Sequence, residues 1–445
     1  MFYQILSLVF FAAAIAIGCV FKKNTGVVSI ALALILGFIA STPDPNDWKV
    51  RYLTITKVSG GVEKTETVEY VKFILNSFDS SLFLMLLGVM FLFCIAENNR
   101  TLELIAKKSI RLCGGKVKLI PVVLFGLGTV ISAVGPGLIS TTALMAVLAM
   151  ALAVETNVEP IKFLLFGGLG AFAGGLSPIT PSAIVAIEKS AQSGFSGIEF
   201  PIAFYMFVIM LFCALLLYFF VFRWHRYKED ANVKFSIAST GDDKFKIKHI
   251  ATLIGIVVTA TVSTIFDIKI GLVAFVVALI LTLCGFADEG AALKKLPWNT
   301  LLMITGVGIL ISLVSGLGGI KLLQDGMSFL MGDFTAAAII TILAGVMSWF
   351  SSASGVVMPT LIPTVAGLQG NPIALIVGIC IGANAAAFSP LSSCGGLMLA
   401  AYSGSEVATT EGKNKMFAHL FFFSAACILV AALFALTGCF GLFSN

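Results

Sequence analysis

Apolar runs of about 20 residues recur along the whole chain, and no other feature of the sequence constrains the fold as strongly. A helix of that length crosses the ~30 Å hydrocarbon core of a bilayer with its backbone polar groups satisfied internally. Hydrophobic residues make up 58% of the chain and charged residues 11%, against about 45–50% and about 25% in soluble domains. The sequence therefore predicts an all-α polytopic membrane protein without a sizeable soluble domain.

One short stretch occurs twice. Residues 160–185 and 372–397 align without gaps at a constant offset of 212, and in both copies a Ser-Pro pair stands 17 residues after a Pro-Ile pair. Proline removes a backbone donor and clashes with the preceding turn, so we expect helix breaks at Pro178 and Pro390. A break at membrane depth is tolerated only where the backbone is buried in protein or lines a wet cavity. Paired interrupted segments therefore indicate a transporter's binding site.

The remaining apolar regions complete two similar halves. Residues 119–154, with a tip near Gly135–Thr142, and residues 335–368 are interrupted by small polar residues, so each is expected to form a re-entrant hairpin. The expected transmembrane helices are 2–21, 25–42, 72–96, 160–190, 201–222, 250–265, 269–287, 299–319, 372–402 and 416–441. We predict two inverted-topology repeats, each of five transmembrane helices plus a re-entrant helical hairpin, with one broken helix per repeat.

The polar segments set boundaries and orientation. Residues 1–222 form the expected first repeat, 223–249 a basic linker and 250–445 the second repeat. Residues 43–71 alternate in polarity and predict a small β-hairpin outside the bilayer, and 98–118 predicts a basic interfacial helix. The clusters placed in the cytoplasm by the positive-inside rule are Lys22 and Lys23, 98–118, the linker, and Lys294 and Lys295. Both termini are then expected on the extracytoplasmic side of the cytoplasmic membrane.

The four interruptions carry hydroxyl, amide, glycine and proline residues and almost no ionisable ones. Helix N-termini created by the breaks suit an anion. Carbonyls freed by unwinding, with Ser and Thr oxygens, suit a hard cation such as Na⁺. Neutral donors can hold a carboxylate while Na⁺ offsets its charge, so the pattern favours a cation-coupled anion carrier.

Two sets of candidate residues follow. The expected substrate contacts are Ser140, Thr141, Thr142, Thr180, Ser352, Ser354, Asn384, Ser392 and Ser393. The expected Na⁺ ligands are Ser132, Gly135, Ser140, Ser177, Ser354, Gly355 and Ser389. Small residues in membrane helices also serve close packing, and that reading stays open for each single Ser or Thr.

Given these segments, the chain resembles the divalent anion:sodium symporters of the ion transporter superfamily, most closely the MatC-like dicarboxylate carriers. Ser140-Thr141-Thr142 stands where that family has its first Ser-Asn-Thr signature, and Ser352–Gly355 is the best match to the second. The resemblance implies hairpin tips that help to bind sodium and a substrate carboxylate. It also implies a homodimer in which a transport domain slides against a scaffold in an elevator motion.

We therefore expect a secondary active transporter that moves a small dianion, a C4-dicarboxylate, together with Na⁺, without any other cofactor and without nucleic acid. Two alternatives keep the fold: a proton-coupled carrier, or an exchanger or exporter of citrate, arsenite or sulfate. An anion channel or membrane enzyme is the alternative from another class. The enzyme reading lacks support, because the sequence shows no nucleophile–base pair, HExxH motif or phosphate-binding loop, and its nine cysteines lack metal-site spacing.

Overall fold

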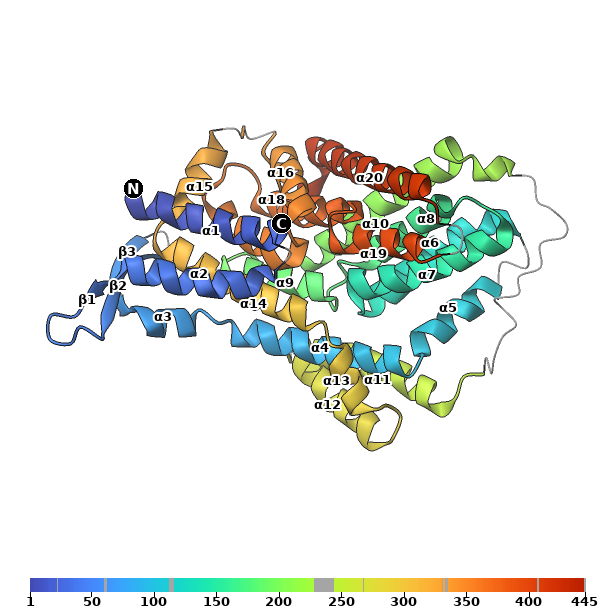
Figure 1. Ribbon diagram of the computed structural model, residues 1–445, viewed down its shortest axis with the longest axis horizontal. Helices are drawn as coiled ribbons and strands as arrows, with labels where there is room; N and C mark the ends of the chain where they lie inside the picture. The colour runs from blue at the N-terminus through green and yellow to red at the C-terminus, as the bar shows by residue number, and fades with distance from the viewer. Residues whose placement is uncertain are drawn as a thin grey trace.

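The computed structural model of the chain is almost entirely helical (Figure 1). It describes residues 1–445 except 22, 60–61, 112–115, 228–243, 267, 330, 333–334, 406–407 and 444–445. Parts of two basic clusters used above for orientation lie outside the described residues. They are Lys22 and much of the linker 223–249.

Among its described residues, the first half contains ten α-helices and a small sheet. The helices are α1 (Phe2–Val20), α2 (Thr25–Ala40), α3 (Tyr70–Asn76), α4 (Ser80–Asn98), α5 (Thr101–Arg111), α6 (Ile120–Val134), α7 (Gly137–Thr156), α8 (Pro160–Gly174), α9 (Pro181–Gln192) and α10 (Glu199–Leu216). The strands are β1 (Thr42–Pro43), β2 (Arg51–Ser59) and β3 (Val62–Glu69).

The second half has the same order of helices. They are α11 (Ile247–Phe266), α12 (Ile270–Leu283), α13 (Glu289–Lys295), α14 (Trp298–Gly316), α15 (Gly319–Ser328), α16 (Ala336–Phe350), the π-helix η4 (Ala353–Val357), α17 (Met358–Leu361), the 3-10 helix η5 (Ile362–Gly367), α18 (Pro372–Ala385), α19 (Ser393–Ser403) and α20 (Thr410–Leu436).

Packing between the halves follows a pseudo-two-fold rule. α11, α12 and α14 correspond to α1, α2 and α4, and α2 packs against α14 just as α4 packs against α12. α6 packs against α8 in the first half, and α16 packs against α18 in the second. Each of these helix contacts is thus matched by a contact between the corresponding helices when the first and second repeats are interchanged. The predicted fold class, an all-α membrane protein of two inverted repeats, is confirmed.

A glycine pair allows two of these helices to approach closely. A Cβ atom on Gly88 of α4 would lie 2.0 Å from the carbonyl oxygen of Gly271 in α12. Small residues at such crossings let membrane helices gain van der Waals contact along their backbones. The two glycines therefore set the distance between α4 and α12.

The lengths of the helices refine the predicted spans. Within the described residues, seven helices are long and apolar enough to cross a membrane, or eight if the pair Ala336–Phe350 and Ala353–Gly367, bent by 118°, counts as one. Both arms of the first hairpin, α6 and α7, are among the seven. Several expected spans are shorter apolar helices, among them α1, α2, α11 and α12. The sequence did not predict the separate short helices α3, α13 and α15.

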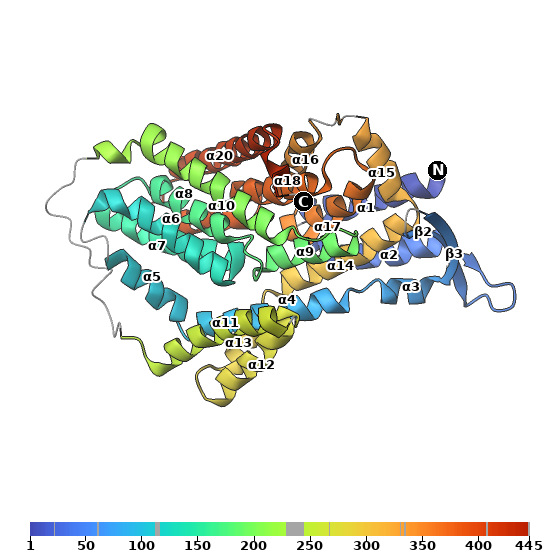
Figure 2. The same ribbon diagram turned by 180° about the vertical axis from the view of Figure 1, so that it is seen from behind.

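The expected β-hairpin is present as part of a three-stranded antiparallel sheet, β1-β2-β3. Tyr52 pairs with Glu69 and Ser59 with Val62, and the tip 60–61 lies outside the described residues. Leu53 and Ile55 are buried, and β2 packs against α14. The sheet lies at one end of the molecule in both views (Figures 1 and 2).

The helices divide into two groups, to which we give names. The frame comprises α1–α4, α11, α12 and α14. The central unit comprises the hairpins, α8 with α9, α18 with α19, and the flanking helices α10 and α20. In Figures 1 and 2, α4, α11 and α12 lie below α6, α7 and α8 of the central unit. Direct packing between the groups is concentrated where α4 meets α9 and where α14 meets η4 and α17.

Candidate functional site

The first broken helix opens between α8 and α9. α8 ends at Gly174, and Pro178 lies in the break before α9 begins at Pro181. The hydroxyl oxygen of Thr180 accepts a hydrogen bond from the Ala183 amide at 3.4 Å and lies 2.8 Å from the carbonyl oxygens of Gly175 and Ser177. Thr180 therefore caps the second half-helix and closes the loop that precedes it.

The second broken helix repeats this device at the same offset of 212. The hydroxyl oxygen of Ser392 caps α19 at the Gly395 amide, 3.5 Å away, and lies 2.8 Å from the Ser389 carbonyl oxygen. Pro390 lies in this break, between the 3-10 turn that ends at Phe388 and the start of α19. Thr180 and Ser392, both expected to contact substrate, thus have backbone partners that stabilise the breaks.

Three other predicted residues of the breaks differ in accessibility. Ser389 is fully buried, and its hydroxyl oxygen accepts from the Leu391 amide at 3.3 Å. Ser393, the first residue of α19, is exposed, and Ser177 is partly buried. The carbonyl groups of Ser177 and Ser389 already accept from the amides of Thr180 and Ser392 within the turns.

The tip of the first hairpin is a tight turn at Gly135-Pro136. Gly135 has a φ angle of +136°, and a Cβ atom there would lie 1.8 Å from the ring of Phe93 in α4. Both constraints require glycine at this position. The turn is at the start of the expected tip, so Ser140, Thr141 and Thr142 lie in the first turns of α7. Thr141 and Thr142 are buried and Ser140 is exposed.

The tip of the second hairpin bends at Ser351 and Ser352. The Ser352 hydroxyl oxygen caps η4 by accepting from the Gly355 amide at 3.1 Å. A Cβ atom on Gly355 would lie 2.7 Å from the end of the Met303 side chain in α14, whereas Ser354 is only partly buried. This tip is thus held against the frame.

The two breaks and the first hairpin meet in the centre of the molecule. The rings of Phe172 in α8 and Phe388 before the second break are perpendicular, with centroids 4.2 Å apart. Leu138 of the first hairpin packs against Gly175, and Thr142 lies beside Cys394 of α19. α9 lies between the two hairpins and contacts both α7 and η4.

Several buried polar atoms of the first hairpin and of α18, close in sequence to the breaks, lack a hydrogen-bond partner. The hydroxyl oxygens of Ser132, Thr141 and Thr142 and the side-chain oxygen of Asn384 are buried without a hydrogen bond. The Asn384 amide nitrogen donates to the Cys380 carbonyl oxygen at 2.7 Å. Leaving such a group unpaired costs about 1–3 kcal/mol, so a ligand or ion that bonds to it removes that cost. Ser29, Ser190 and Trp224 have similarly unpaired atoms elsewhere.

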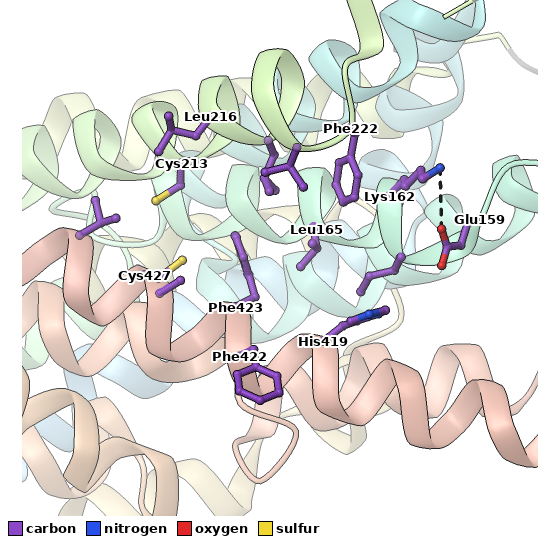
Figure 3. Close-up of a pocket in the computed structure, with 15 residues that line it drawn as sticks. Glu159, Lys162, Leu165, Cys213, Leu216, Phe222, His419, Phe422, Phe423 and Cys427 are labelled. Atoms are coloured by element: carbon purple, nitrogen blue, oxygen red, sulfur yellow. Dashed lines mark ion pairs between the residues drawn. The ribbon is translucent and has the colours of Figure 1, made fainter.

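A large cavity lies away from the predicted residues. It has a volume of about 690 Å³ and lies between α8, α10 and α20, with mostly apolar walls (Figure 3). Polar groups on its wall include Glu159 and Lys162, whose charged atoms are 3.7 Å apart, and His419. None of the predicted substrate or Na⁺ residues lines it, and its chemistry does not match a site for a small dianion.

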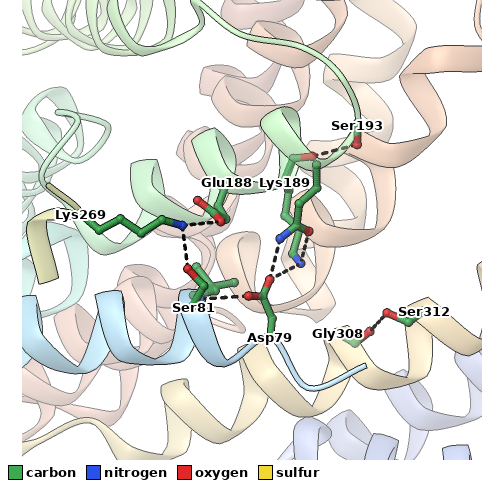
Figure 4. A network of polar contacts seen from close by, with 10 residues as sticks. Asp79, Ser81, Glu188, Lys189, Ser193, Lys269, Gly308 and Ser312 are labelled. Carbon is green, nitrogen blue, oxygen red and sulfur yellow. Dashed lines mark hydrogen bonds and ion pairs between the residues drawn. The ribbon is translucent and has the colours of Figure 1, made fainter. Parts of the chain in front are cut away.

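The sequence reading missed a network of charged groups near the end of α9 that is opposite the break. Asp79, the residue before α4, pairs with Lys189 at the end of α9, and Glu188 pairs with Lys269 before α12 (Figure 4). An acidic residue between two apolar helical segments is a functional candidate by itself, and Asp79 has that position in the sequence. Its partner could not be assigned without the tertiary structure.

No group of three or more His, Cys, Asp or Glu side chains suited to a metal ion occurs among the residues that the structure describes. The cysteines it describes are free, and most of them are buried.

Comparison with known proteins gives two matches. The family model CitMHS, described as "Citrate transporter", matches residues 16–382. The solved structure of the Alcanivorax borkumensis YdaH transporter, described as having an unusual topology, is similar with a TM-score of 0.59 and 12% sequence identity, over 98% of each chain. At this identity the second match shows a shared fold alone. A search of curated proteins gives no match.

Proposed function

Because the chain belongs to the citrate transporter family, and is accordingly a membrane transporter and not an enzyme, we propose that it is a secondary active carrier of a small carboxylate anion. Its preferred substrate is a C4-dicarboxylate, with citrate as the alternative that the family description favours. The observation that supports this most strongly is the pair of matching helix breaks, together with the unpaired neutral polar atoms on the first hairpin and on α18.

The chemistry of the breaks fits an anion accompanied by a cation. α9 begins next to the buried Thr180, and α19 begins at the exposed Ser393. The N-terminal N–H groups and positive dipole ends of both half-helices suit carboxylate oxygens. The substrate contacts that we favour are Thr141, Thr142 and Asn384, whose oxygens have no partner. Ser140, Ser352, Ser354 and Ser393 remain candidates at the partly buried or exposed edges.

We further propose that Na⁺ is the coupling ion. None of the predicted break residues carries a positive charge, so a dianion at this position needs a cation to offset its own charge. Ser132, Ser177 and Ser389 supply oxygen atoms near the breaks, and oxygen ligands are those that hard cations prefer. Gly135 and Gly355 would contribute backbone only, since both lack a side chain. Thr180 and Ser392 act in this proposal as caps that fix the breaks.

The proposed transport cycle is an elevator motion in which the central unit moves against the frame. The concentration of their contacts at α4–α9 and α14–η4 supports a boundary between two units. We also propose a homodimer in the cytoplasmic membrane with both termini on the extracytoplasmic side. Lys294 and Lys295 at the end of α13 support that orientation.

Uptake by purified protein in liposomes tests this function. Labelled succinate or citrate is supplied outside, with either a Na⁺ gradient or choline in its place, at equal pH on both sides. We expect saturable succinate uptake that requires Na⁺. Citrate uptake without succinate uptake would assign the alternative substrate, and uptake driven by a pH gradient in choline would replace Na⁺ by protons. Currents far above carrier rates would indicate a channel and contradict the proposal.

A further inference from the structure

We propose that the ion pairs around Asp79 and Lys189 form a latch, which holds the first broken helix against the frame and stabilises one of the two access states. Asp79, Lys189 and Gln192 form its core, and Ser81, Glu188 and Lys269 form a second arm. This inference rests on the proposed motion of the central unit, and it assigns residues that set the balance between the two states.

The core of the latch connects two helices that are far apart in the sequence. The Lys189 Nζ atom lies 3.1 Å from Asp79 Oδ2 and 2.8 Å from Gln192 Oε1. Gln192 Nε2 donates to the same Asp79 oxygen at 2.8 Å. The other Asp79 oxygen accepts from the Leu82 amide at 3.0 Å and so caps α4. Both oxygen atoms of the Asp79 carboxylate therefore accept at least one hydrogen bond.

The second arm joins the same end of α9 to another frame helix. Lys269, the residue before α12, lies 3.1 Å from Glu188 Oε1 and donates to the Ser81 hydroxyl oxygen at 2.7 Å (Figure 4). Lys269 and Ser81 belong to the frame, and Glu188 belongs to the central unit. Two adjacent residues of α9 are thus tied to α4 and α12 at once.

Burial makes the core pair stronger than an ordinary surface pair. The side chains of Lys189 and Asp79 are 13% and 18% exposed, whereas Lys269 is 48% exposed. Water and salt screen a shielded pair less than an exposed one. A sliding movement that separates α9 from α4 must break these bonds, so they favour the arrangement in which the two helices touch.

The corresponding place in the other half of the molecule has no such charges. Asp79 precedes α4 as Pro297 precedes α14, and Lys189 of α9 corresponds to Ala401 of α19. Asn24 takes the place of Lys269, and its amide donates within the frame to the Asn299 carbonyl oxygen. α4 packs against α9, while α14 and α19 scarcely touch within the described residues. Among the residues that the structure describes, the latch is therefore present on one side of the pseudo-two-fold axis only.

This asymmetry has a functional consequence. In an alternating-access carrier built from two similar halves, symmetric contacts would favour neither state. An ion-pair network on one side lowers the free energy of the state in which it forms, and a population shift follows from that difference. We expect the latch to be released in each cycle when the substrate-loaded central unit moves.

Distance measurement by pulsed electron paramagnetic resonance tests the latch. The full-length chain, with its cysteines replaced by serine or alanine, carries spin labels at Leu75 of α3 and Ser196 after α9, both exposed. We expect one dominant distance between the two spin labels when no residue of the latch is substituted. Lys189→Met and Asp79→Asn should each shift the ratio of the two separations by about tenfold toward the released state.

Two further variants separate the latch from general effects. Lys162→Met removes a lysine that also has an ion-pair partner, Glu159, but lies in α8 away from the frame, and it should leave the ratio unchanged. The charge swap of Asp79→Lys with Lys189→Asp should restore the dominant separation. If a single variant fails to fold, Lys269→Met weakens the more exposed arm and should give a smaller shift in the same direction.

The results distinguish failure of the latch from failure of the proposed transport motion. A second separation that appears with succinate and Na⁺ but is insensitive to Lys189→Met and Asp79→Asn would overturn the latch and leave the motion in place. A single separation in every variant and with every ligand would overturn both. Restoration by the charge swap supports the latch, and equal shifts in Lys162→Met would contradict it.

Discussion

Gly306 of α14 lies so close to Gly26 of α2 that a Cβ atom on Gly306 would be 2.3 Å from the Gly26 carbonyl oxygen. The α4–α12 crossing has the same arrangement, with Gly88 against Gly271. Gly26 corresponds to Gly271 and Gly88 corresponds to Gly306 when the halves are matched helix by helix. The frame therefore contains two equivalent helix crossings, and at each of them the backbones of the two helices are in direct contact.

Gly306→Ala should destabilise the protein. The added methyl group must displace the backbone of α2, and overpacking of this kind costs about 1–3 kcal/mol of unfolding free energy. Gly308→Ala, two residues along the same helix, is the matched control, since a Cβ atom there meets nothing within 4 Å. Thermal unfolding in detergent should show a lower midpoint for Gly306→Ala alone. Equal midpoints would mean that this crossing tolerates a wider separation.

Thr142→Val should weaken substrate binding without loss of stability. The Thr142 hydroxyl is buried beside the Cys394 thiol and has no oxygen or nitrogen partner, and a hydrogen bond to a charged ligand contributes about 1.5–3 kcal/mol. We expect binding to weaken about tenfold or more, measured by succinate-dependent thermal stabilisation in Na⁺. Thr156→Val, on the same helix, removes a hydroxyl that donates to the Leu152 carbonyl oxygen at 2.7 Å and should leave binding unchanged. If both variants weaken binding equally, the effect of Thr142→Val arises from altered helix packing and not from a lost contact with substrate.

Asn384→Leu should abolish uptake while the protein stays folded. The unpaired side-chain oxygen of Asn384 is removed, and its one hydrogen bond lies within its own helix, so stability should change by less than about 1 kcal/mol. Asn371→Leu, at the other end of α18, should lower the stability of the protein and leave uptake unchanged. Asn371 caps the helix at the Ile373 amide, 3.0 Å away, and losing a cap costs about 1 kcal/mol. Unimpaired uptake in Asn384→Leu would remove this residue from the site.

Thr180→Val and Ser392→Ala should each lower the unfolding free energy by about 1 kcal/mol, because each removes the cap of a half-helix. Uptake should also slow, since the carbonyl groups at the breaks lose the hydroxyl that fixes them. Ser393→Ala, at an exposed neighbouring position, is the control for stability. Chemical unfolding monitored by tryptophan fluorescence measures the stability, and the liposome assay measures uptake. Unchanged stability in both cap variants would contradict the structural role.

The sequence by itself determined the membrane architecture and the places where it is interrupted. Length and apolarity define helices through a local rule, since a backbone in lipid must bond to itself. Pro178 and Pro390 mark breaks for an equally local reason, because proline cannot continue the hydrogen-bond ladder. The repeated Ser-Pro pair thus located both broken helices, and the interrupted segments around them located both hairpins.

Only the tertiary structure decided which polar groups are free and which charges meet. Thr180 and Thr142 look alike in the sequence, yet one hydroxyl caps a helix and the other has no oxygen or nitrogen partner. Asp79 and Lys189 are 110 residues apart and pair only because α9 packs against α4. Hydrogen bonds and ion pairs between distant segments depend on how helices pack, and the periodicity of a single helix carries no information about its neighbour's position.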